Sequence, residues 1–281
     1  MTAAPFIKSL GGKTELLPEL IKRMPSRFEN YYEPFLGGGA LFFALSPKRA
    51  VLTDANADLM KTYRSVVDDV ERVFMLLDDH RERHCKTYYY DARDLWNSQA
   101  RRDDPDWTAA MFIYLNRTCF NGLWRVNRSG AFNVPIGRYK TPSIPDRREL
   151  LEASSMLSGC WLEWRDFRDA MKSPQAGDFV YCDPPYDGTF TAYTAGGFTD
   201  ADQADLAFTA RTLAARGVRI MLSNGDTPRI RALYAGMQID VVKCARSVNS
   251  DGKGRGKVSE VIITAGYERP AIKAPKRAKG K

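Results

Sequence analysis

The 281-residue sequence has few of the side chains from which disulfide frameworks and metal centres are built. Its five cysteines are scattered and never form a C-x-x-C pair, and its histidines are two, His80 and His84. This pattern argues against a disulfide framework, a zinc site or a histidine-based metal centre, and it is typical of the reducing cytoplasm. We therefore expect no metal ion in the functional site.

Long apolar runs are also missing. No run is long enough to cross a bilayer, and residues 1–10 lack the apolar stretch of a secretory signal peptide. Hydrophobic residues nevertheless make up 44% of the chain, which favours a globular protein with a substantial core. The length suits one catalytic domain with an inserted or appended module. We expect a cytoplasmic protein that does not enter the membrane and is a monomer in solution.

Acidic residues are absent from the C-terminus, where six basic residues occur from Arg269 onward. The other 36 basic residues of the chain are nearly balanced by its 34 acidic ones. A second basic stretch, residues 117–148, has seven Arg or Lys residues against Asp146 alone. Two separate basic stretches make nucleic acid a reasonable partner. The tail by itself also fits a disordered, solubilising end, and we expect residues 269–281 to be a basic disordered tail.

Short apolar strands alternate with helical segments at both ends of the chain. Near the start, the predicted order is strand 30–35, a glycine turn, helix 40–45, and strand 50–53 stopped by an acid. This order is typical of the front half of a nucleotide-binding α/β unit. The pattern resumes later; its predicted elements are strand 179–182, helix 202–216 and strands 218–222, 239–242 and 258–265.

The segment between these α/β parts has a different composition. A helix is predicted over residues 59–77, an apolar helix restarts at residues 111–115, and residues 116–145 are rich in Asn, Gly, Arg and Pro, which favours loop and hairpin. We therefore predict an α/β sheet split by a middle module. Our boundaries are 1–59 for the first catalytic part, 60–155 for the module and 156–268 for the second catalytic part.

Glycines follow the first predicted strand in the sequence Phe35-Leu36-Gly37-Gly38-Gly39. Such glycines let the backbone turn tightly and approach a ligand closely. Asp54 ends the next strand, near the spacing at which an acid accepts hydrogen bonds from ribose hydroxyls. We interpret Phe35, Gly37, Gly39 and Asp54 as a cofactor site, with a simple turn as the alternative.

A second glycine pair, Gly11-Gly12, precedes Lys13 and superficially resembles a phosphate-binding loop. A Walker A loop also needs a preceding strand and a glycine at position 7, where this chain has Ile7. We therefore reject a nucleoside triphosphatase. Lys13 stays a candidate for contact with a ligand carboxylate, the alternative being an exposed lysine.

The sequence Asp183-Pro184-Pro185-Tyr186 directly follows a predicted buried strand. Two prolines fix a rigid turn, and the carboxyl edge of an α/β sheet is where ligands bind. An aromatic amine is a poor nucleophile, because its lone pair is delocalised into the ring. Hydrogen bonds from the amine to Asp183 and to a proline carbonyl, assigned to Pro184, would localise that lone pair while Tyr186 stacks on the base. The motif therefore favours methylation of an aromatic amine over a purely structural turn.

With these motifs in place, the sequence resembles the Dam-type (D12 class) DNA adenine N6-methyltransferases over residues 6–267. The resemblance depends on an N-terminal cofactor segment, the glycine motif, a DNA-recognition segment and a catalytic segment. In that order the matching residues are Phe6-Ile7-Lys8-Ser9-Leu10-Gly11-Gly12-Lys13; Glu33-Pro34-Phe35-Leu36-Gly37-Gly38-Gly39 with Thr53-Asp54; Tyr114-Leu115-Asn116-Arg117, Phe120-Asn121-Gly122-Leu123, Phe132-Asn133-Val134-Pro135 and Gly137-Arg138-Tyr139; and Tyr181-Cys182-Asp183-Pro184-Pro185-Tyr186, Phe190-Thr191-Ala192-Tyr193, Phe198-Thr199 and Ser223-Asn224.

The resemblance implies a site-specific methyltransferase that uses S-adenosylmethionine and acts on double-stranded DNA, typically at GATC. It also implies a Rossmann-like sheet with an inserted, mainly helical DNA-recognition module that carries a hairpin. The cofactor contacts that it implies are Ser9, Lys13, Asp54 and Asp183. The DNA contacts that it implies are Lys8, Phe120, Asn121, Arg125, Pro135, Arg138 and Tyr139. Ser9 stands where close family members have tryptophan, and Phe120 replaces a common tyrosine.

Adenine inside a duplex cannot present its amine to a cofactor pocket, so we expect the target base to flip out of the helix. Phe120 would then fill the gap by stacking on neighbouring bases, or else it is a core aromatic. Arg125 would read a guanine edge, or else it contacts a phosphate.

Two other functions stay open on the sequence. One is a methyltransferase acting on amino groups of RNA, and the other is a non-catalytic DNA-binding protein that kept the fold. Methylation of cytosine at C5 is disfavoured, because that chemistry needs a cysteine nucleophile, usually after proline, and the chain has no Pro-Cys pair.

Overall fold

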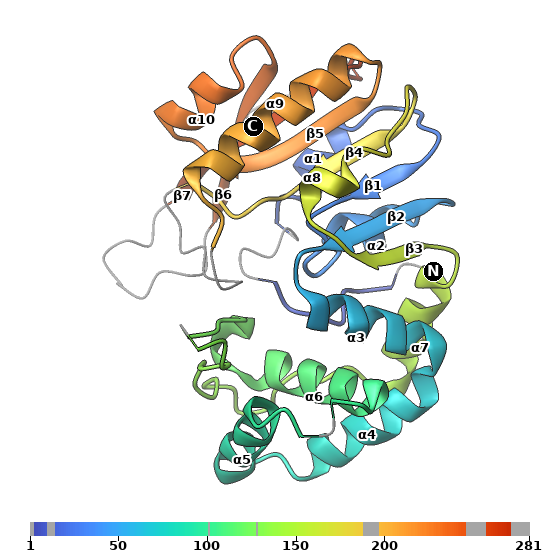
Figure 1. Ribbon diagram of the computed structural model, residues 1–281, viewed down its shortest axis with the longest axis vertical. Helices are drawn as coiled ribbons and strands as arrows, with labels where there is room; N and C mark the ends of the chain where they lie inside the picture. The colour runs from blue at the N-terminus through green and yellow to red at the C-terminus, as the bar shows by residue number, and fades with distance from the viewer. Residues whose placement is uncertain are drawn as a thin grey trace, which may run out of the picture.

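The strand segments form a seven-stranded sheet in the computed structural model, which describes residues 3–9, 15–100, 102–127, 129–187, 197–245 and 257–270 (Figure 1). The strand order is β3-β2-β1-β4-β5-β7-β6. In chain order the bounds are β1 Tyr31–Glu33, β2 Ala50–Asp54, β3 Trp161–Trp164, β4 Phe179–Cys182, β5 Arg219–Gly225, β6 Gln238–Ala245 and β7 Lys257–Ala265. Strands β1 to β5 pair in parallel, and β7 is antiparallel to β5 and β6. The carboxyl ends of β1 to β5 therefore meet at one edge of the sheet.

Helices cover both faces of the sheet, because side chains of each central strand alternate between two hydrophobic clusters. Val180 of β4 packs with α8 (Phe167–Ala170), α9 (Asp200–Ala215) and α10 (Pro228–Leu233). Its neighbour Tyr181 belongs to the other cluster, which includes residues of α1 (Leu17–Arg23), α2 (Ala40–Leu45) and α3 (Ala57–Asp68). No helix in the described part of the chain is long and apolar enough to cross a membrane.

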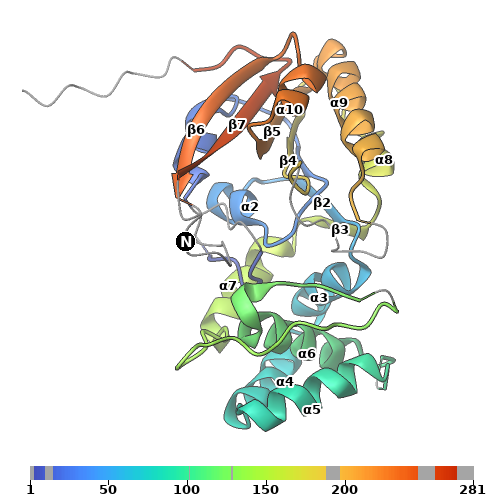
Figure 2. The same ribbon diagram turned by 90° about the vertical axis from the view of Figure 1, so that its left-hand side faces the viewer.

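A helical module lies between β2 and β3 in the chain and forms the lower half of the molecule in Figures 1 and 2. Its helices are α4 (Val70–Glu82), α5 (Lys86–Asn97), α6 (Pro105–Thr118) and α7 (Arg147–Leu157). Helix α6 is buried along nearly its whole length, because α3, α4 and α5 pack around it. Helix α3 lies between the sheet and the module in both views, so it contacts both parts.

The segment between α6 and α7 begins with the short 3₁₀ helix η1 (Phe120–Gly122) and continues as a hairpin. Isolated bridges pair Cys119 with Ile136 and Val126 with Phe132. The ring of Trp124 packs between those of Phe112 and Phe132, at centroid distances of 3.9 and 4.5 Å. An aromatic stack therefore fixes the base of the hairpin to the core of the module.

Two local expectations from the sequence were wrong or incomplete. The single helix expected over residues 59–77 is broken at Asp69, whose backbone leaves the helical region and whose side chain accepts a hydrogen bond from Arg72 N to begin α4. Strand β3 was not expected. It lies at an edge of the sheet and buries only Leu162, so it lacks the apolar run that marks the other strands.

The C-terminal end of the described chain is attached to the sheet. Arg269, grouped with the basic tail on charge alone, forms an ion pair with Asp240 of β6. Tyr267 donates a hydrogen bond to the carbonyl of Arg23 at 2.8 Å. Of the expected tail, residues 271–281 lie outside the described residues.

Candidate active site and DNA-recognition surface

Acidic side chains stand at the carboxyl ends of three adjacent parallel strands. Glu33 ends the central strand β1, Asp54 ends β2 beside it, and Asp183 follows β4 on the other side. The sequence patterns singled out Asp54 and Asp183 separately. The topology brings them to the same edge of the sheet, on either side of Glu33.

Asp54 organises the glycine turn that follows β1. Its Oδ2 accepts a hydrogen bond from Gly37 N and its Oδ1 from Asn56 N, both at 2.9 Å. Gly37 and Gly39 have φ values of 48° and 67°, a region that favours glycine because it has no Cβ. Burial raises the pKa of Asp54, and these N–H groups oppose that shift by stabilising the charged form.

The N-terminal segment that contains Ser9 lies against this turn. A Cβ atom placed on Gly37 would lie 3.2 Å from the Ser9 hydroxyl oxygen, so Ser9 is next to the turn. Lys13 lies outside the described residues. Phe35 is half-buried and stacks on Phe167 at a ring-centroid distance of 5.3 Å, so its ring packs against the start of α8.

Asp183 is half-buried and held by a chain of hydroxyl groups. Ser223 of β5 donates a hydrogen bond to Asp183 Oδ1 at 2.8 Å, and the Tyr181 hydroxyl lies 3.0 Å from the Ser223 oxygen. The carbonyl of Pro185 accepts a hydrogen bond from Gln203 at 2.8 Å. The motif is therefore fixed from β5 and from α9, which suits a carboxylate that must keep one orientation.

Tyr186 is buried, and its ring is anchored at the hydroxyl end. The hydroxyl donates to Glu260 Oε2 of β7 at 2.9 Å. Cys182, just before the motif, packs with the cluster beneath α9. Burial raises the pKa of the Cys182 thiol, so it is not a thiolate nucleophile at neutral pH.

Two acids at this edge were given no role from the sequence. Glu33 is 2% exposed, and Tyr31 donates a hydrogen bond to its Oε2 at 2.7 Å. Burial raises the pKa of Glu33 to about 8, and the neighbouring Asp183 adds to the shift.

Asp166 follows β3, and its carboxylate caps α8 by accepting a 2.8 Å hydrogen bond from Arg168 N. The signal for Asp166 was its place after a strand, and it was missed because β3 was not predicted.

Most of the expected DNA-binding residues gather around η1. Phe120 is 40% exposed, which contradicts the alternative that it is a core aromatic. Its backbone N donates to the carbonyl of Pro135 at 2.9 Å, which brings the two together. The Lys8 ammonium lies 4.2 Å from the centre of the Tyr139 ring, and Tyr139 is 37% exposed. Asn121 and Arg138, next to them in the chain, are both exposed.

Arg125 lies in the hairpin, where Asn133 on the opposite arm orients it. Its Nε donates to Asn133 Oδ1 at 2.7 Å, and Asn133 N donates to the Arg125 carbonyl at 3.2 Å.

Burial lowers the pKa of Lys8, and the neighbouring Arg117 adds to this shift. Among the described residues, no group of three or more His, Cys, Asp or Glu side chains could hold a metal ion.

The strand order, the glycine turn at the first strand and the acid-proline motif after β4 define a Rossmann-like methyltransferase. The family model of D12 class N6 adenine-specific DNA methyltransferases matches residues 9–248. The chain belongs to this family, and it is an adenine-specific DNA methyltransferase.

Relatives match over almost their whole length. The chain is 40% identical to the Type II methyltransferase M1.LlaDCHI of Lactococcus lactis subsp. cremoris, covering 92% of this chain and 94% of the relative. It is 35% identical to the DNA adenine methylase of Escherichia coli K12, covering 96% and 97%. A solved rRNA methyltransferase, AviRa from Streptomyces viridochromogenes, has a TM-score of 0.37 and 14% identity, covering 93% and 90%. That likeness carries no argument about the substrate.

Proposed function

We propose that the protein transfers a methyl group from S-adenosylmethionine to N6 of a flipped-out adenine in duplex DNA, at GATC. The observation that carries the proposal is the placement of Asp183, which Ser223 orients at the same sheet edge as the glycine turn. Relatives named DNA adenine methylase support the substrate. The reaction takes place on cellular DNA, so we also propose a cytoplasmic protein that acts as a monomer on a DNA partner.

The residues around the glycine turn fit S-adenosylmethionine. The left-handed conformation of Gly37 and Gly39 makes a tight turn that carries no side chains at these two positions, and Asp54 provides carboxylate oxygens beside it. We propose that Asp54 accepts from the ribose, that Ser9 and Lys13 contact the methionine part and that Phe35 supports the adenine side. The cofactor, when bound, supplies an electrophilic methyl group.

The chain's own residues would activate and orient the amine. We propose that Asp183 and the Pro184 carbonyl accept the two hydrogens of the adenine amine, which localises its lone pair toward the methyl group. Tyr186 would stack on the flipped base, and its bond to Glu260 keeps the ring in place. Phe120 would occupy the space that the base leaves, at a flipping cost of about a few kcal/mol.

Methylation-aware sequencing of a plasmid, grown with the protein in a methylation-deficient host, tests the proposal. We expect N6-methyladenine at GATC with the wild type and none with Asp183→Ala, because that variant loses an interaction needed in the transition state. A folded Asp183→Ala protein with near-normal turnover would refute the catalytic assignment. Modification centred on another sequence would refute GATC alone, and preference for structured RNA over duplex DNA in competition would refute the DNA substrate.

A further inference from the structure

The N-terminal strap, residues 5–9, runs between the glycine turn and the helical module. Its backbone is bound by the last turn of α6. Asn116, buried there, accepts a hydrogen bond from Lys8 N at 2.8 Å and donates one to the Lys8 carbonyl at 2.9 Å. One side-chain amide therefore pairs with both backbone groups of Lys8, as a neighbouring β-strand would.

Arg117, next to Asn116, holds the preceding part of the strap. Its Nε donates to the Phe6 carbonyl at 2.8 Å and its Nη2 to the Pro5 carbonyl at 2.7 Å. Burial lowers the pKa of Arg117. A buried guanidinium needs hydrogen-bond partners to offset its desolvation, and here the strap carbonyls are such partners. Displacing the strap would therefore be costly.

The opposite side of the strap touches the glycine turn. A Cβ atom on Gly38 would lie 2.9 Å from the Ile7 carbonyl oxygen, closer than such contacts occur. The same strap also contacts the recognition turn η1. A Cβ atom on Gly122 would lie 2.4 Å from Lys8 Cβ, and Asn116 donates to the Gly122 carbonyl at 3.3 Å. One short segment thus packs against both turns.

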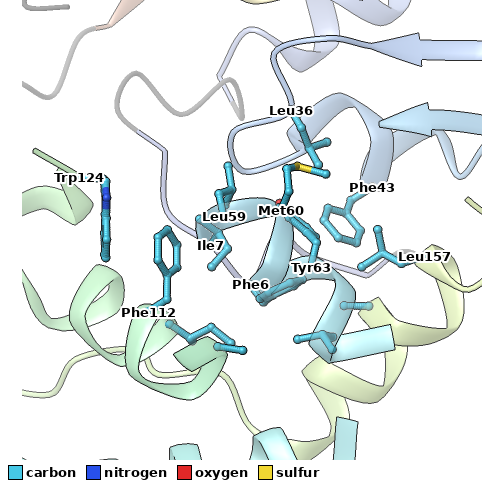
Figure 3. Close-up of a cluster of buried hydrophobic side chains, with 14 of the residues drawn as sticks. Phe6, Ile7, Leu36, Phe43, Leu59, Met60, Tyr63, Phe112, Trp124 and Leu157 are labelled. Atoms are coloured by element: carbon cyan, nitrogen blue, oxygen red, sulfur yellow. The ribbon is translucent and has the colours of Figure 1, made fainter. Parts of the chain in front are cut away.

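Apolar packing also holds the strap against its surroundings. Figure 3 shows Phe6 and Ile7 between Phe112 and Trp124 of the module and the side chains of Leu36 and Phe43 near the glycine turn. Phe6 is fully buried, and its ring lies 5.0 Å from that of Tyr63. The Tyr63 hydroxyl in turn donates to the Gly37 carbonyl at 3.0 Å.

We propose that Asn116 and Arg117 are positioning residues that couple cofactor binding to DNA recognition through this strap. The inference rests on the proposed function, which places the cofactor at the glycine turn and DNA at Lys8, Tyr139 and η1. Each ligand then holds the strap in the position that the other one needs. Because the coupling is between binding free energies, it acts equally in both directions.

Calorimetry on the full-length protein measures this coupling. The affinity for S-adenosylhomocysteine is measured alone and with a saturating duplex that carries the mapped methylation site, and the duplex is then titrated with and without S-adenosylhomocysteine. In the wild type we expect each ligand to raise the affinity for the other by the same factor, roughly 5-fold or more. In Asn116→Ala we expect this factor to fall to about one, because the coupling free energy is lost.

Gly122→Ala tests the same link from the recognition turn while Asn116 itself is unchanged, and it decides the matter if Asn116→Ala does not fold. Gly236→Ala is its matched control, since Gly236 also has a positive φ, of 88° against 66°, but open space where the Cβ would lie. We expect Gly122→Ala to lose the coupling and Gly236→Ala to keep the wild-type factor.

Independent binding of both ligands to the wild type would overturn the inference and leave the proposed function intact. A wild-type factor in folded Gly122→Ala would overturn it as well, as would an equal loss of coupling in Gly236→Ala. Failure of the wild type to bind S-adenosylhomocysteine or any duplex would instead contradict the proposed function itself.

Discussion

At the scale of single residues, the active-site edge carries carboxyl groups in different states. Asp54 accepts two backbone N–H bonds and Asp183 accepts a hydroxyl. Glu33, between them, is buried with its pKa raised to about 8, so its carboxyl group is neutral at pH 7. A neutral Glu33 adds no charge of its own between the side chains of Asp54 and Asp183.

This difference predicts a pH dependence of stability. In the unfolded chain the Glu33 pKa returns to an ordinary value near 4.5, so the folded pKa is the higher one. The stability that the neutral carboxyl contributes is therefore fully present below about pH 4.5 and is lost as the pH rises toward 8. In the wild type, the free energy of unfolding should fall by up to about 1.4 kcal/mol per pH unit in that window. In Glu33→Gln, which cannot ionise, this decrease should be absent.

Urea unfolding of both proteins between pH 5 and 8 measures the effect. Glu29→Gln makes the same chemical change at an exposed position and should follow the wild type at every pH. Parallel stability curves for Glu33→Gln and the wild type would contradict a neutral Glu33.

At the scale of elements, the glycine turn depends on a close backbone contact. Gly38→Ala would place its Cβ 2.9 Å from the Ile7 carbonyl, which is backbone and cannot rotate away. We expect the free energy of unfolding to fall by about 1–3 kcal/mol, as for other overpacked sites, and S-adenosylhomocysteine to bind more weakly. Gly159→Ala, with nothing within 4 Å of the added atom, is the matched control. Equal melting temperatures and affinities for the two variants would show that the turn tolerates the displacement.

The hairpin predicts where sequence discrimination lies. If Arg125, oriented by Asn133, reads a guanine, Arg125→Ala should relax discrimination at one base pair, by roughly 1–3 kcal/mol, while adenine is still methylated. Methylation mapping of the variant against the wild type measures this. A uniform decrease at all sites would assign Arg125 to a phosphate instead.

Elements were predictable where one signal dominated. Helix α2 matches the residues expected for it, and β4 was visible because all of its side chains are apolar or aromatic and buried. The break at Asp69 depends on a capping side chain within a continuous apolar pattern, so periodicity could not reveal it. Asp166 was missed because β3, the strand before it, buries only Leu162 and has no apolar run. The neutral state of Glu33 depends on which strands are neighbours, and a linear pattern does not contain that information.

At the scale of the whole molecule, charge is uneven along the chain. The five basic residues beyond Pro270 have no acid among them. Removing residues 271–281 keeps the ion pair of Arg269 with Asp240, so we expect folding and catalysis to persist. For every phosphate that the tail neutralises, its removal should lower the magnitude of the salt slope for non-specific DNA binding by about 0.9. An unchanged slope in binding assays at several salt concentrations would show that the tail does not touch DNA.

The order of strands in the sheet also has a consequence for synthesis on the ribosome. The central strand β1 pairs with β4, and Asn30 bonds to Asp178 at a separation of 148 residues. At about 5–20 residues per second, roughly 7–30 s pass before β4 is made. During that interval the first catalytic segment has an unpaired strand edge, while the helical module, whose contacts are within one stretch of chain, can already fold. The inserted module is thus complete before the enzyme around it, and nascent chains have to keep β1 from pairing with another strand until the second half arrives.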